Sequence, residues 1–320
     1  MNILVTGGEG YIGSETCRQL IEKGHKVISL DNSSSGNKRC HVEGLVIVRA
    51  DARMEINIST IILKYKIDLV IHLAAKIKVK ESIEQSLVYY DNNVISTISL
   101  LKAMKQTGVN KLVFASTASI YGNNNSDFLI NEWANPMPIN PYAKSKYFCE
   151  EIIEDAYKSW GLNYVNLRFF NVAGASETVG QTDKAGTHLI KVLCEQLCGK
   201  REVVEIYGNC MRDYTHVSDI SNAIILSAFY LRQGGYSYTF NVGYGEGFST
   251  QSVIEMMEKV AGKEINKIYF QETRSGDPER LIADPKKIKD TLGWKPQHQG
   301  LEHICRSALV WEKRQNDAIV

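Results

Sequence analysis

The sequence predicts an α/β protein in which a doubly wound parallel sheet carries a smaller mixed α/β lobe. Strand and helix signals alternate through the first half of the chain, as they do in βαβ units. The segments "DLVIHLAA" and "KLVFAST" are apolar almost throughout, which is typical of strands buried on both faces of a parallel sheet. A glycine-rich turn follows the first strand in "ILVTGGEGYIG". In such folds, ligands bind at the carboxyl ends of the strands.

The individual elements follow from apolar periodicity and from helix-ending residues. A strand in "NILVTG" precedes helical spacing over residues 11–23, which ends at Gly24, a suitable C-cap. "KVISLD" and "LVIVRAD" predict the next two strands. The second half is less regular, with helices expected over 187–199, 217–232, 249–261, 285–291 and 300–315, and short strands near 203–207, 237–242 and 266–270.

Composition excludes several classes of function. The chain has 320 residues, with 37 Lys plus Arg against 36 Asp plus Glu, so no global charge favours nucleic acid or a membrane surface. No apolar run approaches the ~20 residues that span a bilayer, and no signal peptide precedes the first strand, so we expect a cytoplasmic protein. The seven cysteines are scattered, and nothing completes a metal site beside Cys194 and Cys198; we expect no metal.

The glycine turn has the spacing of a dinucleotide-binding (Rossmann) site. Gly7 allows a tight turn, Gly10 lets the backbone approach a pyrophosphate, and Gly13 lets the helix pack on the strand. Asp31 closes the second strand and can accept hydrogen bonds from the ribose hydroxyls. A 2′-phosphate would be repelled by this carboxylate, which favours NAD over NADP. A glycine turn with a surface aspartate is the alternative.

Two further polar residues are weaker candidates for the same site. Asp51 follows the third strand and could meet the adenine amino group, although a loop-capping carboxylate explains it nearly as well. Asn92 in "YYDNNV" could equally lie on a helix surface.

Tyr142 and Lys146 in "NPYAKSK" predict a proton-transfer site. Pro141 favours a helix start, which places residues four apart on one face. The lysine ammonium should favour the phenolate form of a tyrosine whose ordinary pKa is ~10. Ser116 and Thr117 end a buried strand upstream, and their hydroxyls could bind the reacting oxygen. An amphipathic helix beside a turn-capping threonine is the alternative reading.

These motifs, taken together, resemble the extended short-chain dehydrogenase/reductase family and, within it, the nucleotide-sugar 4-epimerases. The likeness runs over nearly the whole chain, through "VTGGEGYIGSET", "LDN", "HLAA", "ESIEQSLVYYDNNV", "FASTASIYG", "NPYAKSK", "LRFFNVAGA", "RDYTHVSDI", "FNVGYGEGFS" and "RSGDPERLIAD". The resemblance implies residues 1–170 as an NAD-binding domain and 171–320 as mainly a UDP-sugar lobe, with segments near 211–242 returning to the first domain.

The resemblance also implies roles for particular residues. The catalytic set would be Thr117, Tyr142 and Lys146. The NAD-contacting positions would be Gly7, Gly10, Tyr11, Ile12, Gly13, Asp31, Asn32, Asp51, Ala52, Leu73, Ala74, Ala75, Asn92, Tyr142, Lys146 and Phe169. The substrate-contacting positions would be Thr117, Tyr142, Asn171, Tyr207, Arg212, Arg274, Asp277 and Leu281. Two arginines suit a diphosphate, and a tyrosine can stack on uracil.

The reaction implied is epimerisation at carbon 4 of a UDP-hexose through a transient 4-keto sugar. Relatives also commonly form homodimers through two helices per subunit, here about 81–107 and 141–159. Apolar Leu100, Leu101, Met104, Phe148 and Ile152 are candidates for that contact.

Departures from the family pattern refine the expectation. Sugar 4,6-dehydratases resemble one another in an Asp/Glu pair where this chain has Ala118 and Ser119, and UDP-glucuronate decarboxylases usually have Glu at the second position; both reactions are disfavoured. Ile77, flanked by Lys76 and Lys78, replaces a lysine that related epimerases often carry.

Two departures concern the substrate. The segment 208–211 is short, which puts the geometry around Tyr207 and Arg212 in question. Leu281 replaces a tyrosine of epimerases restricted to unacetylated sugars, leaving room for an N-acetyl group. The alternatives are an NAD-dependent 4-dehydrogenase or epimerase of another nucleotide-activated sugar, or a dinucleotide-binding protein without catalysis.

Overall fold

A seven-stranded parallel sheet forms the centre of the protein, and its strand order is β11-β6-β5-β4-β1-β2-β3. The computed structural model describes residues 1–34, 42–123, 129–182, 188–272 and 278–317. The strands are β1 (Asn2–Thr6), β2 (Lys26–Asp31), β3 (Val46–Arg49), β4 (Leu69–His72), β5 (Lys111–Thr117), β6 (Asn163–Phe169) and β11 (Tyr238–Val242). The order reverses between β1 and β4, which confirms the predicted doubly wound sheet.

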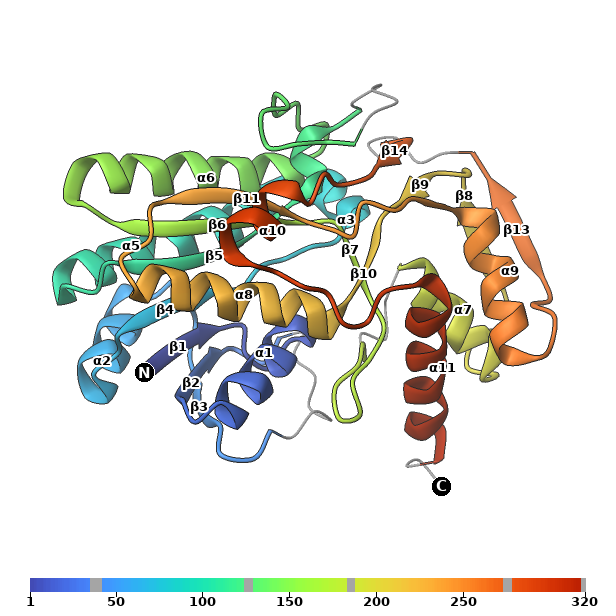
Figure 1. Ribbon diagram of the computed structural model, residues 1–320, viewed down its shortest axis with the longest axis horizontal. Coiled ribbons are helices and arrows are strands. Elements are labelled where there is room, and N and C mark those ends of the chain that lie inside the picture. Colours follow the sequence, from blue (N-terminus) through green and yellow to red (C-terminus); the bar gives the residue numbers. More distant parts are fainter. Residues whose placement is uncertain (35–41, 124–128, 183–187, 273–277, 318–320) are drawn as a thin grey trace.

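Helices cover both faces of this sheet (Figure 1). One face carries α1 (Tyr11–Glu22) and α8 (Val217–Arg232), and the other carries α2 (Glu55–Tyr65), α5 (Ser96–Thr107) and α6 (Pro141–Trp160). Strand β1 has a continuous apolar sequence because both of its faces are buried. Ile3 and Val5 pack in the core on one side of the sheet, and Leu4 packs in the core on the other side.

The chain between β4 and α5 is an irregular helical segment at the carboxyl end of the sheet. It comprises α3 (Val79–Glu84), α4 (Ser86–Tyr89) and the π-helical turn η1 (Tyr90–Ile95). Buried Asn93 holds this turn against the loop after β4: its Oδ1 accepts the Lys76 N–H at 2.8 Å, and its Nδ2 donates to Ser145 Oγ at 2.9 Å. A π-helical turn at this position is the kind of local distortion that accompanies functional sites.

A smaller lobe lies at the carboxyl end of the sheet (Figure 1). It contains the strand pair β8 (Val204–Tyr207) and β13 (Ile268–Gln271), and the helices α7 (Leu189–Leu197), α9 (Thr250–Ala261) and α11 (Leu301–Asp317). A three-stranded sheet follows the order β12 (Phe248–Ser249), β9 (Met211–Arg212), β14 (Arg280–Leu281), and β7 (Asn171–Ala173) pairs with β10 (Tyr214–His216). The helix α10 (Lys286–Leu292) packs on β11 and α8, and η2 (Ala118–Tyr121) follows β5. Helix α8 packs on α1, and β11 pairs with β6, so both lie with the first half of the chain.

Asp213 stabilises the junction between the lobes. Its fully buried carboxylate accepts backbone N–H groups of Tyr244 at 2.9 Å, Gly245 at 2.8 Å and Ala283 at 3.2 Å. Burial raises the pKa of this carboxyl to about 6, although the three hydrogen bonds favour the charged form. One side chain therefore fixes two separate backbone segments, at residues 244–245 and at Ala283, beside the strands that carry Asn171 and Arg212.

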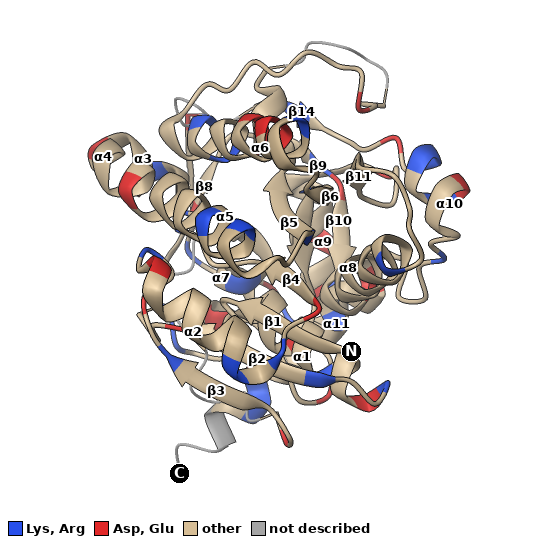
Figure 2. Cartoon of the chain, turned by 90° about the vertical axis from the view of Figure 1, so that its left-hand side faces the viewer, with Lys and Arg blue, Asp and Glu red and all other residues tan. Residues whose placement is uncertain are grey.

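Charged residues of both signs are interspersed over the helices α2 and α6, while α5 carries lysines only (Figure 2). No single-signed stripe of the kind that tracks a nucleic-acid backbone crosses this view. Among the helices that the structure describes, none has the length and apolar composition needed to cross a membrane.

Candidate active site

The glycine turn between β1 and α1 forms a cradle that side chains would fill. Gly7 has a φ of +75°, and a Cβ there would lie 2.7 Å from the Ala74 backbone nitrogen. A Cβ at Gly13 would lie 2.0 Å from the Gly7 carbonyl oxygen. Gly10 precedes the helix and has no side chain to cap it, so the positive end of α1 faces an approaching phosphate directly. The turn therefore fits a pyrophosphate.

Asp31 lies at the end of β2, next to this turn. Its carboxylate accepts the backbone N–H of Ser33 at 2.8 Å and of Glu9 at 3.0 Å. Burial raises the pKa of the Asp31 carboxyl, and these two hydrogen bonds oppose the rise. Each carboxylate oxygen has a second lone pair, which leaves acceptors for ribose hydroxyls. The neighbouring Asn32 is exposed, and its Oδ1 accepts the Ser34 N–H.

The adenine end of the predicted site is shaped by an arginine that sequence reasoning missed. Arg53 pairs with Asp51 at 2.6 Å and also with Asp91, so it joins the loop after β3 to the turn η1. The Arg53 hydrogen bonds lower the pKa of the Asp51 carboxyl. Asn92 is half-buried in η1, while the adjacent Asn93 is the residue that anchors the turn.

The loop after β4 passes directly over the end of β1. The Leu73 N–H donates to the Thr6 carbonyl at 3.0 Å, and the Ala74 N–H donates to Thr6 Oγ1 at 3.3 Å. In the following residues, Ile77 is exposed and the Lys76 ammonium pairs with Glu81 at 3.0 Å. Four of the remaining predicted cofactor residues lie on these same elements or next to them: Tyr11, Ile12, Ala52 and Ala75. Phe169 lies farther along the same edge, at the end of β6. These residues together fit NAD.

Helix α6 presents Tyr142 and Lys146 to the end of β5. The helix begins at Pro141, as predicted, and Asn140 caps it by accepting the Ala143 N–H at 2.8 Å. Tyr142 and Lys146 are both buried, and Tyr142 shares a side-chain hydrogen bond with Thr117, the last residue of β5. The three predicted catalytic residues thus come together at one carboxyl strand end.

Burial dominates the electrostatics of this pair. Burial raises the pKa of Tyr142, and the Thr117 hydrogen bond opposes the rise. Lys146 is itself desolvated, with Nζ 4.4 Å from the centroid of the Phe114 ring, and burial lowers its pKa to about 8. That the lysine charge favours the phenolate form of Tyr142 stays a prediction.

Ser116, whose hydroxyl the sequence also suggested for the reacting oxygen, is bonded elsewhere. It is buried, and its hydroxyl donates to the Glu150 carboxylate on α6. Thr117 instead shares its side-chain hydrogen bond with Tyr142, at the start of the same helix.

The predicted substrate residues lie on neighbouring short strands. Asn171 pairs with Tyr214 between β7 and β10, and Arg212 on β9 is the register partner of Leu281 on β14. The Arg212 guanidinium donates to the Met211 carbonyl at 3.0 Å. Arg274 and Asp277 lie outside the described residues.

The short segment after β8 forms a turn at Gly208, whose φ is +66° and whose N–H donates to the Gln271 carbonyl at 3.1 Å. Tyr207 precedes this turn at the end of β8, and its hydroxyl donates to Glu205 at 2.8 Å. The turn therefore connects β8, which pairs with β13, to β9 in the three-stranded sheet.

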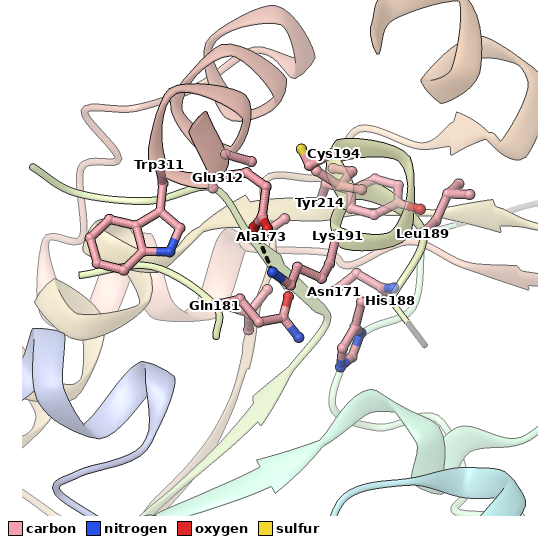
Figure 3. A pocket seen from close by; sticks show the side chains of 14 residues that line it. Asn171, Ala173, Gln181, His188, Leu189, Lys191, Cys194, Tyr214, Trp311 and Glu312 are labelled. Atoms are coloured by element: carbon pink, nitrogen blue, oxygen red, sulfur yellow. Dashed lines mark hydrogen bonds and ion pairs between the residues drawn. The ribbon is translucent and has the colours of Figure 1, made fainter. Parts of the chain in front are cut away.

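A small cavity of about 30 Å³ lies beside Asn171 (Figure 3). Side chains from β7, β10, α7, α11 and the segment between β7 and α7 line it, including Gln181, His188, Leu189, Lys191, Tyr214, Trp311 and Glu312. Lys191 pairs with Glu312 at 2.5 Å, while Trp311 Nε1 is buried without a hydrogen-bond acceptor among the described residues. Sequence reasoning missed His188 and Leu189, because only the fold brings α7 next to Asn171.

Leu281 lies apart from the cavity, in a buried cluster with Ala118, Ile130 and Phe170. Because Ala118 directly follows Thr117, this cluster adjoins the catalytic residues. A larger side chain at position 281 would occupy space next to that strand end.

Three histidines also lie together, at the start of α8 and near α11. One nitrogen from each of His216, His298 and His303 comes within 4.8 Å of the others. However, His216 Nδ1 accepts the Ser218 N–H, so its Nε2 carries the proton and donates to the Ala175 carbonyl at 3.2 Å. Metal coordination by His216 would break one of these bonds, and its local role is to cap α8.

Comparisons with known proteins agree with this geometry. A family model described as GDP-mannose 4,6 dehydratase matches residues 4–307. The chain therefore belongs to that family of extended short-chain dehydrogenases/reductases.

More particular relatives are epimerases. The UDP-glucose 4-epimerase of Azospirillum brasilense is 40% identical over 97% of this chain and 92% of its own length. The structure of the UDP-glucose 4-epimerase from Brucella ovis in complex with NAD has a TM-score of 0.93 and 33% identity, and the match covers 98% of each chain. The UDP-Glc/GlcNAc 4-epimerase from Campylobacter jejuni is 40% identical with a TM-score of 0.84, covering 98% of this chain and 99% of that chain.

Replacing Lys146 by Met should stabilise the protein at neutral pH. The Lys146 pKa falls from 10.5 in the unfolded chain to about 8 in the folded protein, so between these values only the unfolded state binds the proton. Stability of the wild type should therefore rise with pH across this window, by up to about 3 kcal/mol. In Lys146→Met this rise should be absent, because no charge is buried at any pH.

Urea unfolding from pH 7 to 10.5 measures the effect. Lys158→Met is the matched control, because Lys158 lies on the same helix with its side chain exposed. A Lys146→Met protein that is less stable than the wild type at pH 7, or that keeps the alkaline rise, would contradict the assignment.

Proposed function

We propose that this protein is an NAD-dependent epimerase that inverts carbon 4 of a UDP-hexose through a transient 4-keto sugar. The observation that carries the proposal is the buried Thr117–Tyr142–Lys146 set at the end of β5, on the same carboxyl edge of the sheet as the glycine cradle after β1. Relatives that match over nearly the whole chain are UDP-glucose 4-epimerases, which supports the same reaction.

The catalytic side chains have distinct tasks in this proposal. Tyr142 takes the proton from the sugar 4-hydroxyl and later returns it, and Thr117, its hydrogen-bond partner, orients the reacting oxygen. Lys146 supplies the positive charge that a phenol with a raised pKa needs to act as a base. NAD, when bound, supplies the hydride acceptor and donor. Burial of all three side chains keeps water from the reacting carbon.

The NAD site would use the glycine turn and Asp31 as its main anchors. Gly7, Gly10 and Gly13 would admit the pyrophosphate, and the Asp31 carboxylate would accept the ribose hydroxyls. We place this site in a domain of residues 1–170 with returning segments near 211–242, and the substrate site mainly in 171–320. Asn171, Tyr207, Arg212, Arg274, Asp277 and Leu281 would contact the UDP-sugar.

Epimerisation is favoured over the dehydration for which the matching family model is described. Elimination of water needs an acid and a base beyond the Tyr-Lys pair. At the end of β5 this chain has Ala118, which is buried in an apolar cluster, followed by Ser119. The second candidate is an epimerase or 4-dehydrogenase acting on another nucleotide sugar, which the short turn after Tyr207 favours.

Purified protein should convert UDP-glucose into its 4-epimer, and the cofactor should end each cycle in its starting state. Product analysis by chromatography with standards of both epimers measures this conversion. Tyr142→Phe should retain NAD while losing turnover by about 10²–10⁴-fold, because a general acid–base contributes roughly that much. Conversion of other nucleotide sugars alone would favour the second candidate, and near-wild-type turnover by Tyr142→Phe would rule out its role as the base.

Leu281 should determine tolerance of an N-acetyl group. Leu281→Tyr fills space beside Ala118, so the ratio of kcat/KM for UDP-N-acetylglucosamine over UDP-glucose should fall at least about tenfold, the effect of roughly 1.4 kcal/mol. The ratio controls for any general loss of active protein. An unchanged ratio would place the acetyl group elsewhere.

We also propose a homodimer formed through the faces of α3, α4 and α6. Leu87 is 78% exposed, and Ile83 and Phe148 are also exposed there. Leu100, Leu101 and Met104, which the sequence suggested for this contact, are instead buried in the protein's own core.

Light scattering should give a dimer for the wild type and a monomer for Leu87→Arg. Leu63→Arg should remain dimeric, because Leu63 is exposed on α2, away from the proposed contact. A monomeric wild type would exclude this contact.

A further inference from the structure

A buried ion pair ties the catalytic helix to the sheet. Glu150 on α6 and Arg168 on β6 are 4% and 7% exposed, and their Oε2 and Nη2 atoms lie 2.6 Å apart. Arg168 Nε also donates to Glu150 Oε1 at 3.1 Å, and the Ser116 hydroxyl donates to the same oxygen. The Glu150 carboxylate therefore joins α6 to the ends of both β5 and β6.

The network continues from Arg168 to the substrate side of the protein. Arg168 Nη1 donates to the Tyr121 hydroxyl at 2.8 Å, which donates to Asn241 Oδ1 at 2.7 Å. Asn241 Nδ2 donates to the Ile130 carbonyl at 2.8 Å, and Ile130 bridges to Ala283, two residues after Leu281. A continuous chain of buried hydrogen bonds thus runs from the catalytic helix to the segment after β14.

The position of this ion pair is specific to the catalytic residues. Glu150 lies one helical turn beyond Lys146 and two beyond Tyr142 on the same buried face of α6. Ser116 directly precedes Thr117 in β5. Any change in how Glu150 meets Ser116 and Arg168 would therefore shift Tyr142 relative to Thr117.

We propose that Glu150 and Arg168 are positioning residues for the reaction. Their ion pair fixes Tyr142 and Lys146 against Thr117, and it holds the Glu150 carboxylate one helical turn from Lys146 on the same buried face of α6. This inference rests on the proposed epimerisation.

The surroundings of Lys146 support the electrostatic part. Burial lowers its pKa, and the Cys149 and Glu150 side chains oppose that effect. From the other elements, neutral His72 on β4 and the Phe114 ring on β5 face it, and Tyr142 lies one turn back on α6. Of the two side chains that oppose the effect of burial, Glu150 is the one held in place by an ion pair with Arg168.

Glu150→Gln tests the proposal, because the amide keeps an acceptor for Ser116 and removes the charge. Without that charge Lys146 loses its proton at lower pH, so the alkaline limb of the kcat profile should move to lower pH. At pH 8.5 kcat should fall at least about tenfold, while KM for the UDP-sugar should change by less than about threefold. The matched control is Glu195→Gln, which removes a buried carboxylate paired with Arg201 at 2.9 Å in the smaller lobe.

A second variant guards against loss of folding, since Glu150→Gln leaves a buried guanidinium without a counter-charge. Glu150→Gln combined with Arg168→Met removes both charges and should restore stability, as replacement of a buried ion pair by an apolar group often does. Its alkaline limb should still lie at lower pH than that of the wild type. Equal displacement in Glu195→Gln, or an unmoved limb in both Glu150 variants, would overturn the proposal.

A substrate-free measurement separates this inference from the proposed function. The rise in unfolding stability with pH, which comes from Lys146, should begin at lower pH in the Glu150 variants than in the wild type. If the wild type converts no nucleotide sugar, the proposed function fails, and this measurement still decides whether Glu150 controls Lys146. A rise that begins at the same pH in all variants would refute the coupling.

Discussion

The contact between the glycine turn and the ends of β1 and β4 is the constraint on which the rest of the structure depends. No side chain fits at Gly7 or Gly13, because their Cβ atoms would come within 2.7 Å of the Ala74 nitrogen and 2.0 Å of the Gly7 oxygen. The start of α1 therefore lies directly over the point where the strand order reverses. The N-terminus of α1, which suits an anion, and the Asp31 carboxylate, which suits ribose hydroxyls, consequently share one edge of the sheet. Every other candidate group is arranged with respect to that edge.

The second constraint is the burial of the proposed catalytic groups. The proposed reaction needs a charged tyrosine and lysine at a place from which the protein excludes water. Both Tyr142 and Lys146 are buried, and burial moves the two pKa values in opposite directions, each toward the neutral form. A buried network of charged and polar groups behind α6 offsets this effect and also fixes the helix. The same burial that destabilises the charged forms makes each nearby dipole more effective, which is the ordinary electrostatic condition of an active site.

The sequence was sufficient for the fold because its signals are local. Continuous apolar strands, Pro141 at the start of α6, and Gly24 after α1 all predict elements without knowledge of distant contacts. Tyr142 and Lys146 could be proposed together for the same reason, since they are neighbours on one helix. Arg53 and Asn93 hold separate segments together and were missed, because nothing near them in the sequence marks their partners. Ser116 and Thr117 look alike in the sequence, and only the structure shows that the Ser116 hydroxyl donates to Glu150.

A few side chains, more than the fold, determine which reaction is proposed for this protein. A sheet, glycine turn and Thr-Tyr-Lys set of this kind suit oxidation and reduction of a nucleotide sugar in general. What restricts the chemistry here is the apolar Ala118 at the end of β5, where a carboxylate would add an elimination step. Leu281 packs in the same cluster, so Ala118 and the residue proposed to shape the sugar pocket belong to one small core. Evolution of a different activity on this scaffold would therefore require repacking of that cluster, and the buried chain from Glu150 to Ile130 ties the same cluster to the catalytic helix.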